Sequence, residues 1–151
     1  MRLEEEISNS KPIPPRERAM LNVLFTASWI DNILNRHMRN YGITHPQYNI
    51  LRILNGSAPN GLCVLDIKGR MIDRSSNVSR LVEKLRERGL LHRIASESDR
   101  RMVLVTISDS GLLLLQKIEQ EVFNVQDNKP GNNLQEADLA LLADLLDRFR
   151  E

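Results

Sequence analysis

The sequence is poor in the features that mark secreted or membrane-spanning proteins. It has one cysteine, Cys63, in 151 residues. That excludes an intramolecular disulfide framework and suits a reducing compartment. It has no apolar run long enough to span a membrane and no secretory leader at its start. A chain of this length buries a core without disulfides or metals. We therefore expect a cytoplasmic protein with no membrane association.

Common catalytic and metal-binding patterns are also missing. None of the three histidines stands at metal-ligand spacing from Cys63 or from a carboxylate. No glycine-rich phosphate loop, nucleophile elbow or zinc-protease motif occurs. The sequence therefore predicts neither an enzyme nor a bound metal or cofactor.

The chain has no large excess of positive or negative charge, because its formal net charge is only +1. The distribution is uneven, however. Residues 68–101 contain ten basic and five acidic side chains, whereas the last eighteen residues contain two basic and five acidic ones. A basic middle beside an acidic end indicates contact with phosphate. The alternative is that both segments are simply solvated helix faces.

Periodic apolar residues predict a long first helix. Residues 1–15 form an N-terminal extension in which three prolines oppose a helix. From Arg16 to about Tyr41, apolar residues recur at spacings of three and four, and Gly42 ends the run. Such a long stripe is typical of a helix that packs against a partner chain.

Three shorter helices are predicted next. Thr44 and Gln47 form a capping box for a helix that stops at residues 55–56. A short helix follows from roughly Val64 to Met71. Residues 73–77 offer several N-caps for a helix over residues 75–88, whose apolar face holds Val78, Leu81, Val82 and Leu85.

The pattern then changes to strands. Residues 91–95 and 102–107 read as a hairpin with a polar tip at residues 96–101. Ser108 caps a helix to about Gln126, and Asn133 with Glu136 is the expected cap of the last helix. We therefore predict a mainly α fold with a small β-hairpin wing, in which a winged helix-turn-helix is joined to a helical dimerisation region.

This order of elements predicts binding to double-stranded DNA, because an exposed helix fits the major groove and its N-terminal residues meet base edges. The candidate base readers are Ser75, Ser76, Asn77 and Arg80. The cations better placed for phosphate are Arg74, Lys84 and Lys68. The hairpin would carry Arg100 or Arg101 into the adjacent minor groove.

At these residues the sequence resembles the MarR family of transcription regulators. The resemblance rests on residues 75–85 and 88–93, on residues 99–108 followed by Gly111, and on residues 42–48. The family's Asp-x-Arg wing motif is matched by Asp99 and Arg101. The resemblance runs from about Arg16 to Phe149, and its strength lies in the order and spacing of the motifs together.

The resemblance implies a homodimer held together by residues 16–42 and 109–151, with a DNA-binding lobe at 43–108. The two lobes would face adjacent major grooves of a pseudo-palindrome. Asp99 would support the wing by ion pairing, whereas a plain turn residue is the alternative. Many members bind a small aromatic acid or sense oxidants through cysteine.

Two further sites follow as expectations, each with a structural alternative. An effector pocket is expected around Trp29, His37, Tyr41 and Tyr48, which otherwise belong to the core or to an interface. Cys63 is a candidate redox sensor, although a lone cysteine is more often a small buried hydrophobe.

The function that the sequence predicts is a dimeric, effector-responsive regulator, most often a repressor in such families. Two rival functions stay open: a protein-interaction module without DNA binding, which the near-neutral charge favours, and a small-molecule binding protein, which needs no basic wing.

Overall fold

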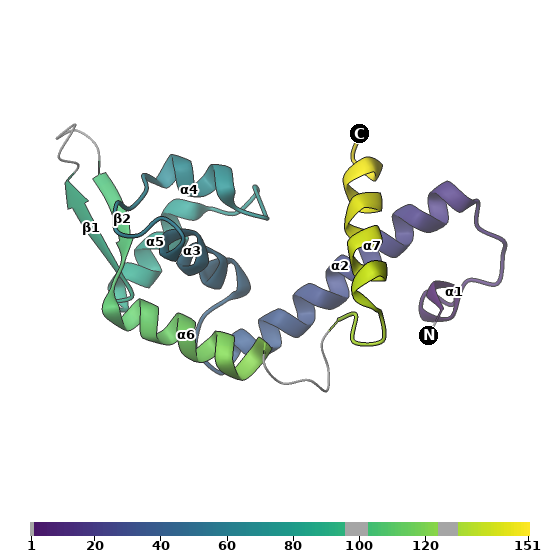
Figure 1. The fold of residues 1–151 in the computed structure, drawn as a ribbon, viewed down its shortest axis with the longest axis horizontal. Helices are drawn as coiled ribbons and strands as arrows, with labels where there is room; N and C mark the ends of the chain where they lie inside the picture. Colours follow the sequence, from purple (N-terminus) through teal and green to yellow (C-terminus); the bar gives the residue numbers. More distant parts are fainter. Residues whose placement is uncertain (1, 96–102, 124–129) are drawn as a thin grey trace. The chain divides into compact units, whose positions relative to one another are not determined.

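The computed structural model of the chain describes residues 2–95, 103–123 and 130–151. The chain forms two compact units, residues 1–115 and 116–151 (Figure 1). The helices are α1 (Leu3–Glu6), α2 (Pro15–Arg39), α3 (His45–Asn55), α4 (Val64–Arg70), α5 (Val78–Glu87), α6 (Asp109–Phe123) and α7 (Glu136–Phe149), and the strands are β1 (Leu91–Ala95) and β2 (Val103–Ile107). The predicted fold class, mainly α with one small hairpin, is confirmed.

A lobe made of α3, α4, α5 and the hairpin holds the main core of the first unit (Figure 1). Each of these elements contributes side chains that are less than 2% exposed, and they are Ile50, Leu51, Leu54, Ile67, Val82, Leu85, Leu91 and Val105. A fully buried side chain of this kind contributes roughly 1.5–3 kcal/mol. The apolar faces predicted from helical spacing therefore meet in one place.

The hairpin is antiparallel and is extended by one further bridge. Leu91 pairs with Ile107 and Ala95 pairs with Val103. Leu62 exchanges two backbone hydrogen bonds with Val105, at 3.0 and 2.8 Å. Gly61 precedes that bridge with a φ of +72°, and a Cβ there would lie 2.8 Å from the carbonyl oxygen of Val105. Glycine is required because the two backbones approach so closely.

Helix α2 begins and ends slightly differently from the prediction. Pro15 is its first residue, which is allowed because a proline there sacrifices no helical hydrogen bond. It ends at Arg39 rather than Tyr41, and the chain turns through Gly42 with a φ of +67°. Its apolar stripe is largely exposed within this chain, with Leu24 at 61% and Trp29 at 45%.

The N-terminal extension is partly helical and lies on α2. Leu3 of α1 is buried, and the carboxylate of Glu4 pairs with Arg18 of α2 at 2.5 Å. The Arg18 guanidinium holds the pKa of the Glu4 carboxyl below its ordinary value, chiefly by hydrogen bonding.

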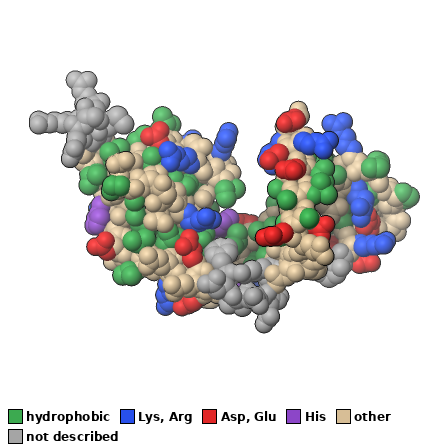
Figure 2. Space-filling view, viewed as in Figure 1, with side chains coloured by type: hydrophobic (Ala, Val, Ile, Leu, Met, Phe, Trp, Pro, Cys, Tyr) green, Lys and Arg blue, Asp and Glu red, His purple; other side chains and the backbone are tan. Residues whose placement is uncertain are grey.

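The second unit corrects one predicted helix cap. Helix α7 is preceded by Gln135, whose backbone N–H donates to the Asp138 carboxylate at 3.2 Å. The expected cap, Asn133 with Glu136, is therefore wrong, because the helix begins two residues later. The apolar stripe of α7 is exposed within the chain, as Figure 2 shows. Across the described ranges, no helix has the length and apolar character that crossing a membrane requires.

Candidate nucleic-acid interface

Helix α5 presents one face to the core and the other to solvent. Val78, Val82 and Leu85 are buried, whereas Arg80 and Lys84 are exposed on the opposite side. Asn77 caps the helix, because its side-chain oxygen accepts the backbone N–H of Arg80 at 3.1 Å. The helix therefore starts at Val78, three residues after the predicted start at residue 75.

The residues that precede α5 form a turn organised by Asp73. Its carboxylate accepts the Ser75 hydroxyl at 2.6 Å, the Ser75 N–H at 2.9 Å and the Ser76 hydroxyl at 2.8 Å. These bonds, led by the two hydroxyls, hold the pKa of the Asp73 carboxyl below its ordinary value. Asp73 thus organises a separate turn ahead of α5, whose own cap is Asn77.

This turn limits the hydrogen-bonding groups that the four predicted base readers have available for a base. The hydroxyls of Ser75 and Ser76 already donate to Asp73, so toward a base they remain acceptors. The Asn77 oxygen serves as the helix cap, which leaves its amide NH₂ as the group without a partner in the turn. No described residue accepts a hydrogen bond from the Arg80 guanidinium, so Arg80 is the strongest of the four candidates.

The cations of the lobe fall into two groups. Among the described residues, none forms an ion pair with Lys68, Arg74, Arg80 or Lys84, and all four are exposed. By contrast, Glu83 binds Arg86 at 2.6 Å and Arg93 of β1 at 3.2 Å. Hydrogen bonding to Arg86 and the charge of Arg93 hold the pKa of the Glu83 carboxyl below its ordinary value. The two groups therefore differ in pairing: Arg86 and Arg93 share Glu83, whereas the other four have no ion pair with a described residue.

The expected wing contacts, Asp99, Arg100 and Arg101, lie outside the described residues. Strand β1 is described up to Ala95 and strand β2 from Val103. Glu83 ties β1 to α5 through Arg93, so the base of the hairpin is fixed to the helix that it flanks.

The four residues expected to line an effector pocket are spread over the first unit. Tyr48 is buried in the lobe at 4% exposure, and His37 and Tyr41 are half-buried near the end of α2. Trp29 lines a different hollow, of about 250 Å³, together with Phe25 and with Leu3 of α1. None of the other three residues lines that hollow.

A cavity that the sequence did not suggest lies where α2, α3 and the turn before α5 meet. Its volume is about 510 Å³, and its wall includes Asp31, Asn35, His45, Asn49 and Asp73. One network links α2 to the start of α3. The Asp31 carboxylate contacts His45 Nδ1 and the Asn35 amide, each at 2.8 Å, and the Asn35 oxygen accepts the His45 N–H at 3.2 Å.

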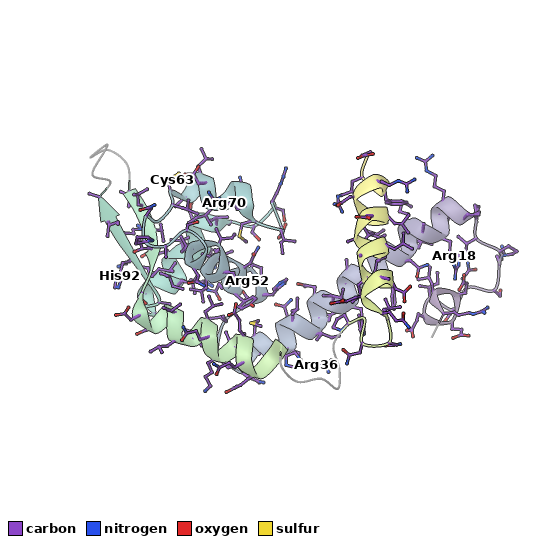
Figure 3. The ribbon with its side chains drawn as sticks, viewed as in Figure 1. Arg18, Arg36, Arg52, Cys63, Arg70 and His92 are labelled. Atoms are coloured by element: carbon purple, nitrogen blue, oxygen red, sulfur yellow. The ribbon has the colours of Figure 1, made fainter. Side chains whose placement is uncertain are left out.

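Cys63 has a local structural role at the start of α4 (Figure 3). Its sulfur accepts the Asp66 N–H at 3.4 Å, and its thiol donates to the Asp66 carboxylate at 3.0 Å. It is half-buried and caps the helix, a role that neither expectation for it included. The redox role stays a prediction.

Known proteins resemble this chain in both sequence and fold. Residues 43–103 match the model of the MarR family. The HTH-type transcriptional regulator PapX of Escherichia coli is 25% identical over 112 residues, which cover 73% of this chain and 68% of PapX. The HTH-type transcriptional regulator MhqR of Bacillus subtilis is 29% identical over 91 residues, which cover 59% of this chain and 60% of MhqR. The chain thus spans about three-fifths to two-thirds of the length of these curated relatives.

The match of fold extends further along the chain than the family model. The crystal structure of a MarR mutant from Escherichia coli complexed with operator DNA has a TM-score of 0.73 and 21% sequence identity, and it covers 83% of this chain and 89% of that one. The chain carries a MarR-family domain. The resemblance noted from the sequence is confirmed over residues 43–103, and both relatives are named for transcription regulation rather than for a reaction.

The Asp73 turn of the MarR-family domain generates a pH prediction. In a ¹³C NMR titration the Asp73 carboxyl should have a pKa below the ordinary 3.8. Changing both Ser75→Ala and Ser76→Ala should raise it toward that value, because the hydroxyls stabilise the ionised form. Since the folded pKa is the lower one, this stabilisation is complete above the unfolded pKa and disappears as pH falls through the folded pKa.

Ser79→Ala is the matched control, because Ser79 is an exposed serine of α5 with no bond to Asp73. It should leave the Asp73 titration unchanged. An unaltered pKa in the double variant would show that the hydroxyls do not organise the turn.

Proposed function

We propose that the chain is a homodimeric, sequence-specific transcription regulator, acting as a repressor, that binds double-stranded DNA in the cytoplasm. The proposal rests chiefly on the solvent face of α5. In a MarR-family domain, that face carries Arg80 and Lys84 without ion pairs to described residues, beside a two-stranded hairpin. An exposed capped helix of this kind fits the major groove of B-DNA.

The residues divide by the part of DNA that they would contact. Arg80, with Ser75, Ser76 and the Asn77 amide, is proposed to meet base edges, because these residues stand at the N-terminal end of α5. Lys68, Arg74 and Lys84 are proposed to contact phosphates. The wing residues Arg100 and Arg101, supported by Asp99, are proposed to enter the minor groove. A repressor then acts by occupying an operator that overlaps a promoter.

Recovery of bound sequences from a random duplex pool tests this function. We expect a two-fold symmetric motif whose half-sites lie about one helical turn, roughly 10 bp, apart. Phosphate contacts should make the logarithm of the association constant fall steeply with that of salt, by about 0.9 per contact. A bound partner with no salt dependence would favour the protein-interaction module instead.

Arg80→Ala should weaken operator binding by about 5- to 150-fold, or ~1–3 kcal/mol, and relax one base position per half-site. Arg86→Ala is the matched control on the same helix, since Arg86 is already bound to Glu83, and it should change affinity much less. Fluorescence anisotropy on the selected duplex measures both. Equal losses in the two variants would remove Arg80 from the reading surface.

Dimerisation is proposed because α2 and α7 each expose an apolar stripe. On α2 the exposed side chains include Met20, Leu24 and Trp29. On α7 they are Leu139, Leu141, Leu142, Leu145 and Phe149 (Figure 2). Contiguous apolar surface of this kind is unusual on a monomer and marks an interface. A dimer also matches the two-fold symmetry expected of the operator.

Leu145→Asp should shift the protein from dimer to monomer in sedimentation velocity runs at micromolar concentration, because a buried unpaired charge opposes association. Ala140→Asp is its control. It places the same charge on the face of α7 that holds Asp144 and Asp147, at helical spacings of four and seven. A dimer that survives Leu145→Asp would exclude α7 from the interface.

The regulator is proposed to respond to a small molecule at the cavity of Asp31, Asn35, His45, Asn49 and Asp73. Asp73 belongs both to this cavity and to the turn that holds Ser75 and Ser76. A molecule bound there would thus touch the base-reading turn directly. The wall has two carboxylates and no Lys or Arg, so it suits an amine better than the aromatic acid that the family resemblance implied.

Benzylamine and benzoate are matched probes of that site. We expect benzylamine to shift the NMR amide signals of Asn49 and Asp73 at lower concentration than benzoate does. Asp31→Asn should weaken the amine's effect several-fold by removing one carboxylate. Equal or stronger shifts with benzoate would contradict the assignment.

A further inference from the structure

One side chain connects α5, the proposed recognition helix, to the turn at the end of α2. Arg88 follows directly after α5. Its Nη2 donates to the carbonyl oxygen of Tyr41 at 3.1 Å, and its Nη1 donates to the carbonyl oxygen of Gly42. Both acceptors lie in the turn that follows the last residues of α2. The contact therefore spans 46 residues of sequence and joins two different helices.

The chemistry of this contact suits a rigid joint. The acceptors are carbonyl oxygens two and three residues past the end of α2, and the C-terminal end of a helix carries partial negative charge, so a cation is favoured there. A guanidinium binds two acceptors from one plane, which fixes direction as well as distance. Gly42 leaves room for it, because a Cβ at this residue would lie 3.3 Å from Arg88 Nη2.

The joint between α2 and the lobe contains Met38 of α2, which is fully buried. The backbone between α2 and α3 is a short turn through Gly42, whose φ of +67° is a left-handed conformation that glycine adopts without strain. The network of Asp31, Asn35 and His45 ties α2 to α3. Arg88 supplies the tie to the recognition helix itself. The neighbouring Arg86 stays within the lobe, bound to Glu83.

We propose that Arg88 is a positioning residue that sets the angle between α5 and α2, and through it the half-site spacing that the dimer accepts. The inference rests on the proposed function, in which α2 belongs to the dimer interface and α5 reads DNA. In a dimer joined through α2, the angle between α5 and α2 within each subunit determines the distance and rotation between the two α5 helices. Arg88 itself contacts no base in this account.

The test measures affinity as a function of half-site spacing. Duplexes carry the selected half-sites with two base pairs removed, one removed, none changed, one added and two added, and another duplex carries one half-site alone. For the unaltered dimer, a change of one base pair should weaken binding on the order of tenfold, because each base pair rotates the half-sites by roughly 35° and the mismatch must be met by deformation.

In Arg88→Met the spacing profile should flatten, so that a one-base-pair change weakens binding by less than about threefold, while affinity for the single half-site stays within about twofold of the unaltered protein. Arg88→Lys keeps a cation for the carbonyl oxygens but not the two-pronged geometry, so its profile should lie between the two. Arg86→Met, the matched control, should keep the sharp profile.

The outcomes separate this inference from the function that it rests on. A sharp profile in Arg88→Met overturns the positioning role alone. A uniform loss at every spacing and at the single half-site, in both Arg88→Met and Arg88→Lys, also overturns it, because general destabilisation affects all duplexes equally. If the unaltered protein shows no preferred spacing, the dimeric DNA-binding function itself fails.

Discussion

The burial of one face of α5 is the constraint on which the rest of the lobe depends. Val78, Val82 and Leu85 are each 3% exposed or less, so the helix cannot rotate without exposing its apolar stripe. At roughly 1.5–3 kcal/mol for each such side chain, this outweighs any single surface ion pair, which contributes about 0–1 kcal/mol. The core therefore determines which residues face solvent, and the cations at that surface take their direction from it.

Local pairing explains how a nearly neutral chain presents a cationic face. Glu83 has two oxygens, and each is used by an arginine, Arg86 on the same helix and Arg93 on β1. These ion pairs offset positive charge on the side of α5 next to β1. Arg70 (Figure 3) donates to the Ser57 hydroxyl at 2.9 Å, which orients its guanidinium but leaves its charge in place. Net charge is thus a poor guide to this protein's partners, since position rather than sum decides the local field.

The sequence predicted well those features that depend on residues close together in the chain, such as helix caps and apolar stripes. The capping box of Thr44 and Gln47 is present, with the Thr44 N–H donating to Gln47 at 3.0 Å. Ser108 caps α6 by accepting the Gly111 N–H at 3.0 Å. Thr44 stands at the right spacing from Gln47 without a competing cap beside it, whereas Ser108 was predicted correctly although Asp109 and Ser110 follow it. The apolar stripes of α3 and α5 were found because burial follows helical spacing closely.

The turn before α5 shows why other features escaped prediction. Residues 73–77 contain four side chains able to cap a helix, and local chemistry does not rank them. In the structure Asn77 is the cap, and Asp73 binds the two serines instead. Similarly, the cavity needs residues from α2, α3 and this turn, which only the tertiary fold brings together. The Asp-x-Arg wing motif was visible in the sequence, but residues 99–101 lie outside the described part of the chain.

The position of Asp73 carries a further consequence for regulation under the proposed function. Its carboxylate both lines the cavity and holds the hydroxyls of Ser75 and Ser76. A cation in the cavity would compete with those hydroxyls for the same oxygens, and the turn would then offer DNA different hydrogen-bonding groups. Coupling between two binding sites is reciprocal, so a molecule that lowers affinity for DNA by some factor is itself bound less tightly on DNA by that factor. No movement of the lobes is needed for this coupling, whereas Arg88 acts on the angle between helices. Under the proposed function, a molecule in the cavity would act through the reading surface, whereas Arg88 would act through the spacing of the lobes.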